Sequence, residues 1–223
     1  DTLILSATSS SLNSATNAQL ANIEAVSGSS ATAGIHINLS SQSEGFTIAG
    51  SAFADTLTGG SGADSVNAGT GDDAINGFVG DDTIDGGGGN DTLFLTETSS
   101  SLNSATNAQL VNVEAVSGSS AIAAIVVSLA NQIERFSITG GDFSDTLTGG
   151  FGADSVNAGA GDDAINGFVG ADTIDGGGGN DTLILSATSS SLNSATNAQL
   201  ANIEAVSGSS ATAGIHINLS SQS

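Results

Sequence analysis

The sequence predicts an all-β solenoid in which very short strands alternate with glycine-rich turns, and three observations predict it. Residues 1–43 recur unchanged as residues 181–223, and a diverged copy begins at Asp91, so the chain carries a 90-residue tandem repeat. Inside each copy lies a second repeat of nine residues, whose eighth residue is aliphatic. The chain has 23 acidic residues and a single basic one, Arg135. This excess of negative charge indicates that the repeats bind cations.

The two periods divide the chain into alternating blocks and spacers. In chain order these are the end of a block (1–4), a spacer (5–49), a block of five nonapeptides (50–94), a spacer (95–139), a second block of five (140–184) and a partial spacer (185–223). All 17 aspartates follow the nonapeptide register, and eleven of them occupy its sixth position. The regular positions of the aspartate and the aliphatic residue within each nonapeptide predict a turn that ends in Asp, followed by a strand with one inward-facing aliphatic residue.

The spacers lack the nine-residue period, yet parts of them alternate as strands do. Ile35–Leu39 alternates apolar and polar residues, and Phe46–Ile48 is expected to form a second strand. Asn17–Val26 carries aliphatic residues at three-residue spacing, which favours a short helical turn before or within a strand. We therefore expect each spacer to form about two wider coils of the same solenoid, with a broader apolar core.

The nonapeptide turns offer the ligands that calcium prefers. A turn such as Gly59–Asp64 combines a carboxylate with backbone carbonyls that glycine leaves uncovered. Calcium takes about six to eight oxygen ligands, whereas magnesium demands a stricter octahedron and zinc or copper would favour His or Cys. The other interpretation of these aspartates is a solvated acidic face, in which Asx-turns satisfy the backbone.

Because two nonapeptides make one coil, we expect Asp64 to face Asp82 and Asp73 to face Asp91, with the same pairing in the second block. Phe53 and Phe143 replace a turn glycine, so full sites are not expected at the aspartates that follow them. The expected carboxylate ligands are Asp64, Asp73, Asp82, Asp91, Asp154, Asp163, Asp172 and Asp181. The expected turn glycines are Gly60, Gly62, Gly71, Gly80, Gly87, Gly89, Gly150, Gly152, Gly161, Gly170, Gly177 and Gly179.

Several nonapeptides resemble a known family. Gly59–Asn67 (GGSGADSVN), Gly86–Phe94 (GGGGNDTLF) and Gly176–Ile184 (GGGGNDTLI) resemble the repeats of RTX (repeats-in-toxin) proteins, over about half of the chain. The resemblance implies a right-handed parallel β-roll with calcium in its turns, about two to three ions per block, and secretion to the exterior or surface of a Gram-negative bacterium. Because the core is thin and the acidic residues repel one another, we expect the blocks to be largely disordered without calcium.

Composition also bears on function. Nucleic acids and anionic membranes need Lys and Arg clusters that are absent, and no apolar run predicts membrane insertion. The adjacent acids Asp72–Asp73 and Asp81–Asp82 recur as ordinary repeat members, which argues against an enzyme. We interpret the chain as a secreted calcium-stiffened rod in an adhesin, surface layer or extracellular filament, which self-associates end to end or through neighbouring repeats. The alternative is a calcium-triggered folding and secretion domain of a larger RTX toxin or exoenzyme.

Overall fold

The computed structural model describes residues 1–220 and is built from parallel β-strands that are mostly three residues long. In every strand of the two nonapeptide blocks the middle residue is a buried aliphatic side chain, as the eighth-position pattern predicts. The chain forms two compact units, one of residues 1–95 and 99–115 and the other of residues 96–98 and 116 onward. The predicted all-β parallel solenoid is confirmed in each unit.

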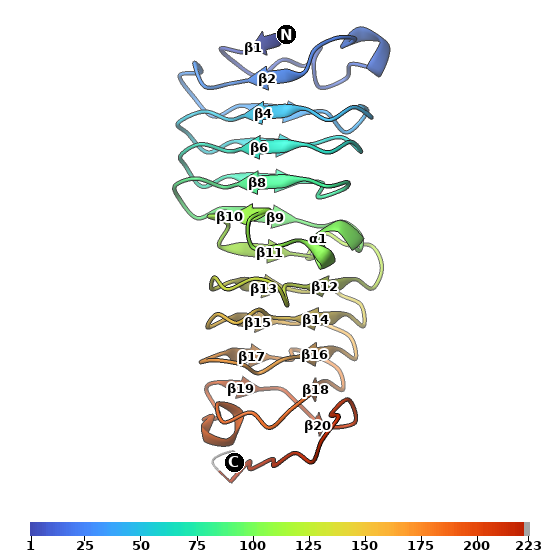
Figure 1. Cartoon of the computed structure of the whole chain (residues 1–223), viewed down its shortest axis with the longest axis vertical. Coiled ribbons are helices and arrows are strands. Elements are labelled where there is room, and N and C mark those ends of the chain that lie inside the picture. Colours follow the sequence, from blue (N-terminus) through green and yellow to red (C-terminus); the bar gives the residue numbers. More distant parts are fainter. Residues whose placement is uncertain (221–223) are drawn as a thin grey trace. The chain divides into compact units, whose positions relative to one another are not determined.

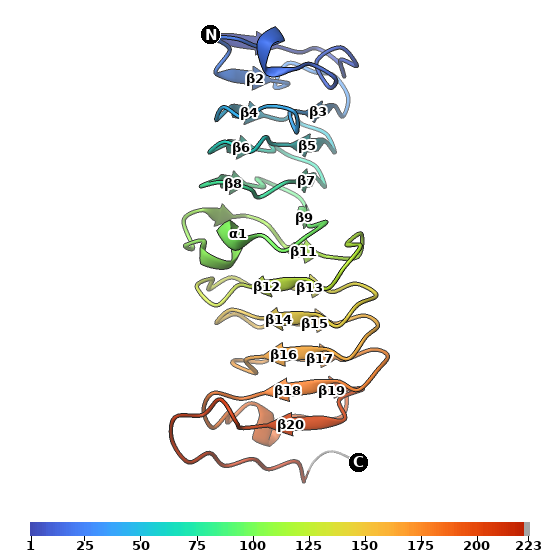
Figure 2. The same ribbon diagram turned by 90° about the vertical axis from the view of Figure 1, so that its right-hand side faces the viewer.

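In the first unit the strands form two rows (Figure 1). One row consists of β1 (Thr2–Ile4), β2 (Ala25–Ser27), β4 (Thr47–Ala49), β6 (Ser65–Asn67), β8 (Thr83–Asp85) and β10 (Leu110–Val111). The other consists of β3 (His36–Asn38), β5 (Thr56–Thr58), β7 (Ala74–Asn76) and β9 (Thr92–Phe94), and Figure 2 shows it beside the first. A 3-10 helix at Asn17–Gln19 and α1 (Ser100–Ser104) complete this unit.

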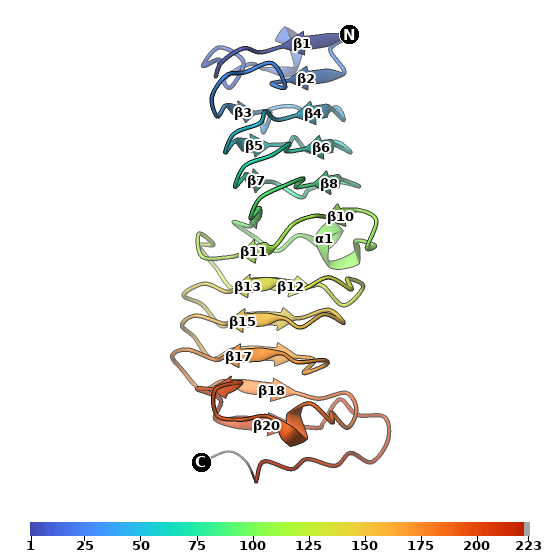
Figure 3. The same ribbon diagram turned by 90° about the vertical axis from the view of Figure 1, so that its left-hand side faces the viewer.

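The second unit repeats the two-row arrangement (Figure 3). One row contains β12 (Val126–Ser128), β14 (Thr146–Thr148), β16 (Ala164–Asn166), β18 (Thr182–Ile184) and β20 (Ala205–Ser207). The other contains β13 (Ser137–Thr139), β15 (Ser155–Asn157), β17 (Thr173–Asp175) and β19 (Leu200–Ala201), and a 3-10 helix spans Leu192–Ser194. Strand β11 (Ala115–Ser117) falls at the boundary between the units. None of the helices in residues 1–220 is long and apolar enough to cross a bilayer.

The number of residues along the chain between paired strand positions distinguishes blocks from spacers. Within a block, each coil takes 18 residues, so Leu57 pairs with Ile75 and Ile75 with Leu93. In the first spacer, Leu3 pairs with Val26 and Val26 with Ile48, which makes steps of 23 and 22 residues. The predicted pair of wider coils is therefore confirmed, as is the helical turn that precedes β2.

The Ser/Thr/Asn-rich start of the spacer covers an open strand edge. Strand β3 begins its row, and Thr8 Oγ1 accepts a hydrogen bond of 2.8 Å from the His36 N–H. Asn13 Nδ2 donates to the His36 carbonyl at 3.0 Å, and Asn13 Oδ1 accepts from the Asn38 N–H at 2.9 Å. These side chains replace the missing strand partner, which protects an edge that would otherwise pair with another chain.

A step of 90 residues moves a position from one row to the other. Leu3 on β1 and Leu93 on β9 are equivalent residues of successive copies, yet within the first unit they belong to different rows. Five nonapeptides make a half-integral number of 18-residue coils, which causes this change of row. Successive copies therefore present their equivalent side chains on different faces of the solenoid.

Candidate calcium site

The sixth-position aspartates form hydrogen-bonded ladders along the turns. The Asp73 Oδ1 accepts a hydrogen bond of 2.7 Å from the Asp55 N–H, and Asp91 Oδ1 accepts one of 2.8 Å from the Asp73 N–H. Asp82 Oδ1 accepts from the Asp64 N–H at 2.8 Å in the same way. The second block repeats the pattern with Asp163, Asp172 and Asp181 as acceptors. The structure thus brings together the aspartate pairs that the nonapeptide register predicts.

Two columns of turns result, one for each row of strands. Column A is defined by Asp55, Asp73 and Asp91 in the first unit and by Asp145, Asp163 and Asp181 in the second. Column B is defined by Asp64, Asp82, Asp154 and Asp172. All these aspartates are at most 3% exposed, so they do not form the solvated acidic face that the composition also allows.

Column A leaves carboxylate oxygens without partners. The Oδ2 atoms of Asp73, Asp91, Asp163 and Asp181 are buried and accept no hydrogen bond. The turns around them use backbone conformations that favour glycine, with φ of 124° at Gly71 and 144° at Gly89. A Cβ on Gly89 would lie 1.9 Å from the Gly71 carbonyl oxygen, so only glycine allows the two turns to stack this closely. Buried acceptors without donors beside stacked carbonyls form a cradle for a cation.

Column B satisfies its carboxylates with the chain's own N–H groups. Asp64 Oδ2 accepts from the Gly60 N–H at 2.7 Å, and Asp82 Oδ2 accepts from the Val79 N–H at 2.8 Å. The corresponding bonds to Asp154 and Asp172 are 2.8 and 2.7 Å. The first turn of column A is similar, because Oδ2 of Asp55 and of Asp145 accepts a backbone N–H as well. Among the aspartates of the two columns, buried oxygens without a hydrogen-bond partner therefore occur only on the last two of column A in each block.

Phenylalanine explains part of this difference. Phe78 and Phe168 occupy the second position of a column B turn and are 1% exposed. Both phenylalanines have negative φ, whereas the glycine at the same position of a column A turn has positive φ, 107° at Gly69 and 92° at Gly87. From the nonapeptide register alone, the two columns are expected to bind calcium alike. The aromatic residue at a glycine position is visible in the sequence, but because Gly80 and Gly170 remain in these turns, the sequence predicts that they still bind calcium.

Electrostatics also favours a cation. Burial, together with the nearby carboxylates of Asp91, Asp55 and Asp72, raises the pKa of Asp73 to about 6. Burial likewise raises the pKa values of Asp82, Asp163 and Asp172 to about 6. The pKa values of Asp64, Asp91 and Asp181 are raised in the same direction by burial. Ionising these groups therefore costs more free energy than ionising an exposed carboxyl, and a bound cation offsets that cost.

The donor set fits calcium. Across residues 1–220 no three acidic, His or Cys side chains converge on one point, so a cation here would take many of its oxygens from backbone carbonyls. Mixed carboxylate and carbonyl coordination is typical of calcium, which tolerates irregular geometry and high coordination numbers. Magnesium would require a regular octahedron and would retain waters.

Comparison with known families agrees with this chemistry. The family model described as RTX calcium-binding nonapeptide repeat (4 copies) matches residues 47–75, 58–93, 139–167 and 149–183. These matches contain every aspartate of columns A and B. The two nonapeptide blocks are RTX calcium-binding repeats. Comparison with curated proteins gave no match. The RTX blocks make this chain a calcium-binding repeat module, and their β-solenoid is a structural calcium-binding fold.

Proposed function

We propose that this chain is a secreted structural module of an adhesin, surface layer or extracellular filament, and that its RTX blocks stiffen on binding calcium. The observation that supports this proposal is the set of buried, partnerless Oδ2 atoms in column A. Such oxygens destabilise a metal-free solenoid and become ligands when calcium is present, so binding energy becomes folding energy. The recurrence of the acidic pairs as ordinary repeat members favours a structural role over catalysis.

Within the RTX blocks we propose that column A binds calcium more tightly than column B. The ligands of column A are Asp73 and Asp91 with the glycine turn Gly87–Gly89, and their counterparts in the second block. Calcium at Asp64 and Asp82 would first have to displace the N–H groups of Gly60 and Val79. Replacing an existing charge-assisted hydrogen bond lowers the net gain from binding.

The first test is far-UV circular dichroism during a calcium titration, with magnesium at equal ionic strength as the control. A cooperative gain of β signal with calcium alone is expected, because calcium completes the buried sites. A folded spectrum that a chelator leaves unchanged would contradict the proposal, since the aspartates would then stabilise nothing through a metal.

We also infer that a second copy of this chain docks on an apolar stripe of the second unit. The stripe consists of Ile133, Phe151 and Val169, which are 63%, 65% and 49% exposed. They lie on successive turns of column B, where the Phe151 N–H donates to the Gln132 carbonyl at 2.9 Å and Gly170 packs against Gly152.

Two of the three stripe residues differ between the copies. The first copy carries Ser43 and Ser61 where the second carries Ile133 and Phe151. In the same turns Gly45 is replaced by Arg135, and Asp81 is replaced by Ala171, so the column becomes less negative. Two chains with a formal charge of −22 repel each other, and these replacements lower the repulsion where an apolar contact can form.

The variant Ile133→Ser together with Phe151→Ser restores the residues of the first copy and serves as the test. With calcium, sedimentation and negative-stain electron microscopy should show assemblies of the wild-type chain and mostly single particles of the variant. Val79→Ser, on the equivalent turn of the first unit, is the matched control. Wild-type single particles at all calcium concentrations would contradict self-association and would favour the calcium-triggered folding domain.

A further inference from the structure

Each RTX block has two partnerless carboxylates, and the second one lies where the block meets the spacer. Asp73 is followed in its column by the nonapeptide turn that ends in Asp91. Asp91 is followed instead by spacer residues, because its N–H donates to Glu114 Oε2 at 2.8 Å. Asp91 is 0% exposed, and its Oδ2 accepts no hydrogen bond. A nonapeptide partner therefore cannot account for the second free oxygen.

Asn112 stacks on Gly86 as Ala68 stacks on Gly50 earlier in the column. It adopts φ of 51°, a left-handed conformation that Asn tolerates better than most residues. A Cβ on Gly86 would lie 2.0 Å from the Asn112 carbonyl oxygen and 2.7 Å from Asp91 Oδ2. These two oxygens therefore lie close to each other beside Gly86, within the span that one calcium ion bridges at calcium–oxygen distances of about 2.3–2.6 Å. The Asn112 side chain is held aside, because Nδ2 donates to Asp85 Oδ1 at 2.8 Å.

Glu114 takes the role of a sixth-position aspartate, because its carboxylate accepts the N–H of the preceding aspartate in the column. Only one residue separates it from Asn112, so the longer glutamate side chain is needed to reach the Asp91 N–H. Its Oε2 is used by that contact, which leaves Oε1 for a cation.

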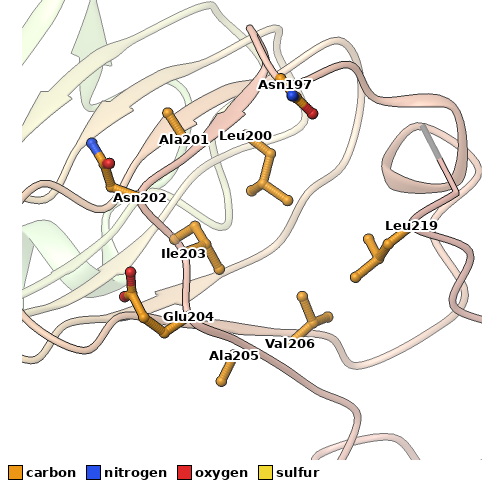
Figure 4. Close-up of a pocket in the computed structure, with 9 residues that line it drawn as sticks. All are labelled: Asn197, Leu200, Ala201, Asn202, Ile203, Glu204, Ala205, Val206 and Leu219. Carbon is orange, nitrogen blue, oxygen red and sulfur yellow. The ribbon is translucent and has the colours of Figure 1, made fainter. Parts of the chain in front are cut away.

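The second unit repeats the arrangement. The Asp181 N–H donates to Glu204 Oε2 at 2.7 Å, and Asp181 Oδ2 is buried without a partner. Asn202 has φ of 50°, and a Cβ on Gly176 would lie 1.9 Å from its carbonyl oxygen and 2.6 Å from Asp181 Oδ2. Figure 4 shows Asn202 and Glu204 among the residues that line a cavity, together with Leu200, Ile203, Val206 and Leu219.

We propose that each junction between an RTX block and the following spacer holds a calcium ion of its own. Its ligands are Asp91 Oδ2, the Asn112 carbonyl and the Glu114 carboxylate in the first unit, and Asp181, Asn202 and Glu204 in the second. The site rests on the proposed calcium-binding function but uses spacer residues that lie outside the nonapeptide motif. It closes the end of column A and makes the docking of the first spacer coil depend on calcium.

The test compares the double variant Glu114→Gln/Glu204→Gln with the control Glu44→Gln/Glu97→Gln, which makes the same change of charge at exposed positions. Glutamine can still accept the Asp91 and Asp181 N–H groups, so the variant keeps the hydrogen bonds and loses only the anionic ligands. Calcium ions bound per chain are counted by isothermal titration calorimetry. The junction variant should bind about two fewer ions than the control, one for each junction.

Three outcomes separate the possibilities. An equal ion count and affinity in the two glutamine variants overturns the junction site while leaving the RTX sites intact. A wild-type chain that binds no calcium overturns the proposed function and the junction site with it. The variant Glu114→Ala/Glu204→Ala removes the acceptor as well, and binding that is lost only in this alanine variant would assign the glutamates a purely structural role.

Discussion

Replacing Asp73 or Asp64 by asparagine should separate the two columns, because the same substitution meets different partners. In Asp73→Asn the side chain can still accept the Asp55 N–H through Oδ1, and its amide then places an N–H₂ group where the free Oδ2 lies. A donor at that point cannot bind calcium. In Asp64→Asn the side chain faces two donors, the N–H groups of Phe46 and Gly60, and in either orientation of the amide one of them loses its acceptor.

The magnitudes follow from these contacts. A saturated calcium site raises the free energy of unfolding by about 1.4 kcal/mol for each tenfold rise in free calcium. Asp73→Asn should lower this calcium dependence by at least about that amount. Asp64→Asn should leave the dependence nearly unchanged and lower the free energy of unfolding by roughly 1–3 kcal/mol at every calcium concentration, the cost of one unsatisfied buried N–H.

Urea unfolding at a series of buffered calcium concentrations measures both quantities. The slope of the free energy of unfolding against the logarithm of free calcium reports on the sites, and the vertical offset between variants reports on the hydrogen bond. An unchanged slope in Asp73→Asn would refute the assignment of calcium to column A. Equal losses of slope in both variants would refute the distinction between the columns.

Three further predictions test the turns, the core and the pH dependence. Gly89→Ala should lower the free energy of unfolding by at least about 1–3 kcal/mol because of its φ of 144°, whereas Gly88→Ala should be nearly neutral, since the nearest atom to its Cβ is Thr70 Cγ2 at 3.6 Å. Phe78→Ala should cost about 3–5 kcal/mol in the same urea assay, and Phe53→Ala, at a 44% exposed position, much less. On folding, the pKa values of Asp73, Asp82, Asp163 and Asp172 rise from 3.8 to about 6. Between pH 3.8 and about 6 the calcium-free fold therefore binds more protons than the unfolded chain, and its free energy of unfolding should fall as the pH rises through this range. Circular dichroism with a chelator, from pH 5 upward, should therefore show β signal that declines towards pH 7, while calcium restores it; a chelated β signal that grows with pH would contradict the pKa argument.

Much of the fold could be predicted because the residues that determine it recur at regular intervals in the sequence. The eighth-position aliphatics identify the inward residue of every nonapeptide strand, and the sixth-position aspartates identify each turn. The alternation at Ile35–Leu39 also predicted β3 correctly. In these segments local pattern and tertiary packing coincide, since each coil contacts only its neighbours.

The remaining features depend on contacts that no period encodes. Thr8 and Asn13 bond to β3 from residues 28 and 25 positions earlier, although their segment has the composition of a flexible linker. Glu114 continues the aspartate ladder of column A from a spacer that lacks the nonapeptide register. Its role becomes visible only when the stacking of Asn112 on Gly86 is known.

Part of the difference between the columns accompanies the packing of the core. At the end of each block the coil widens, since Ile84 pairs with Leu110, which lies 26 residues later. Phe78 and Phe168 are buried in column B at this widening and replace the second-position glycine. Column A keeps glycines at 87 and 89 and keeps its free carboxylates. In the last turn of each column, the same turn position therefore serves core packing in column B and an open glycine turn in column A.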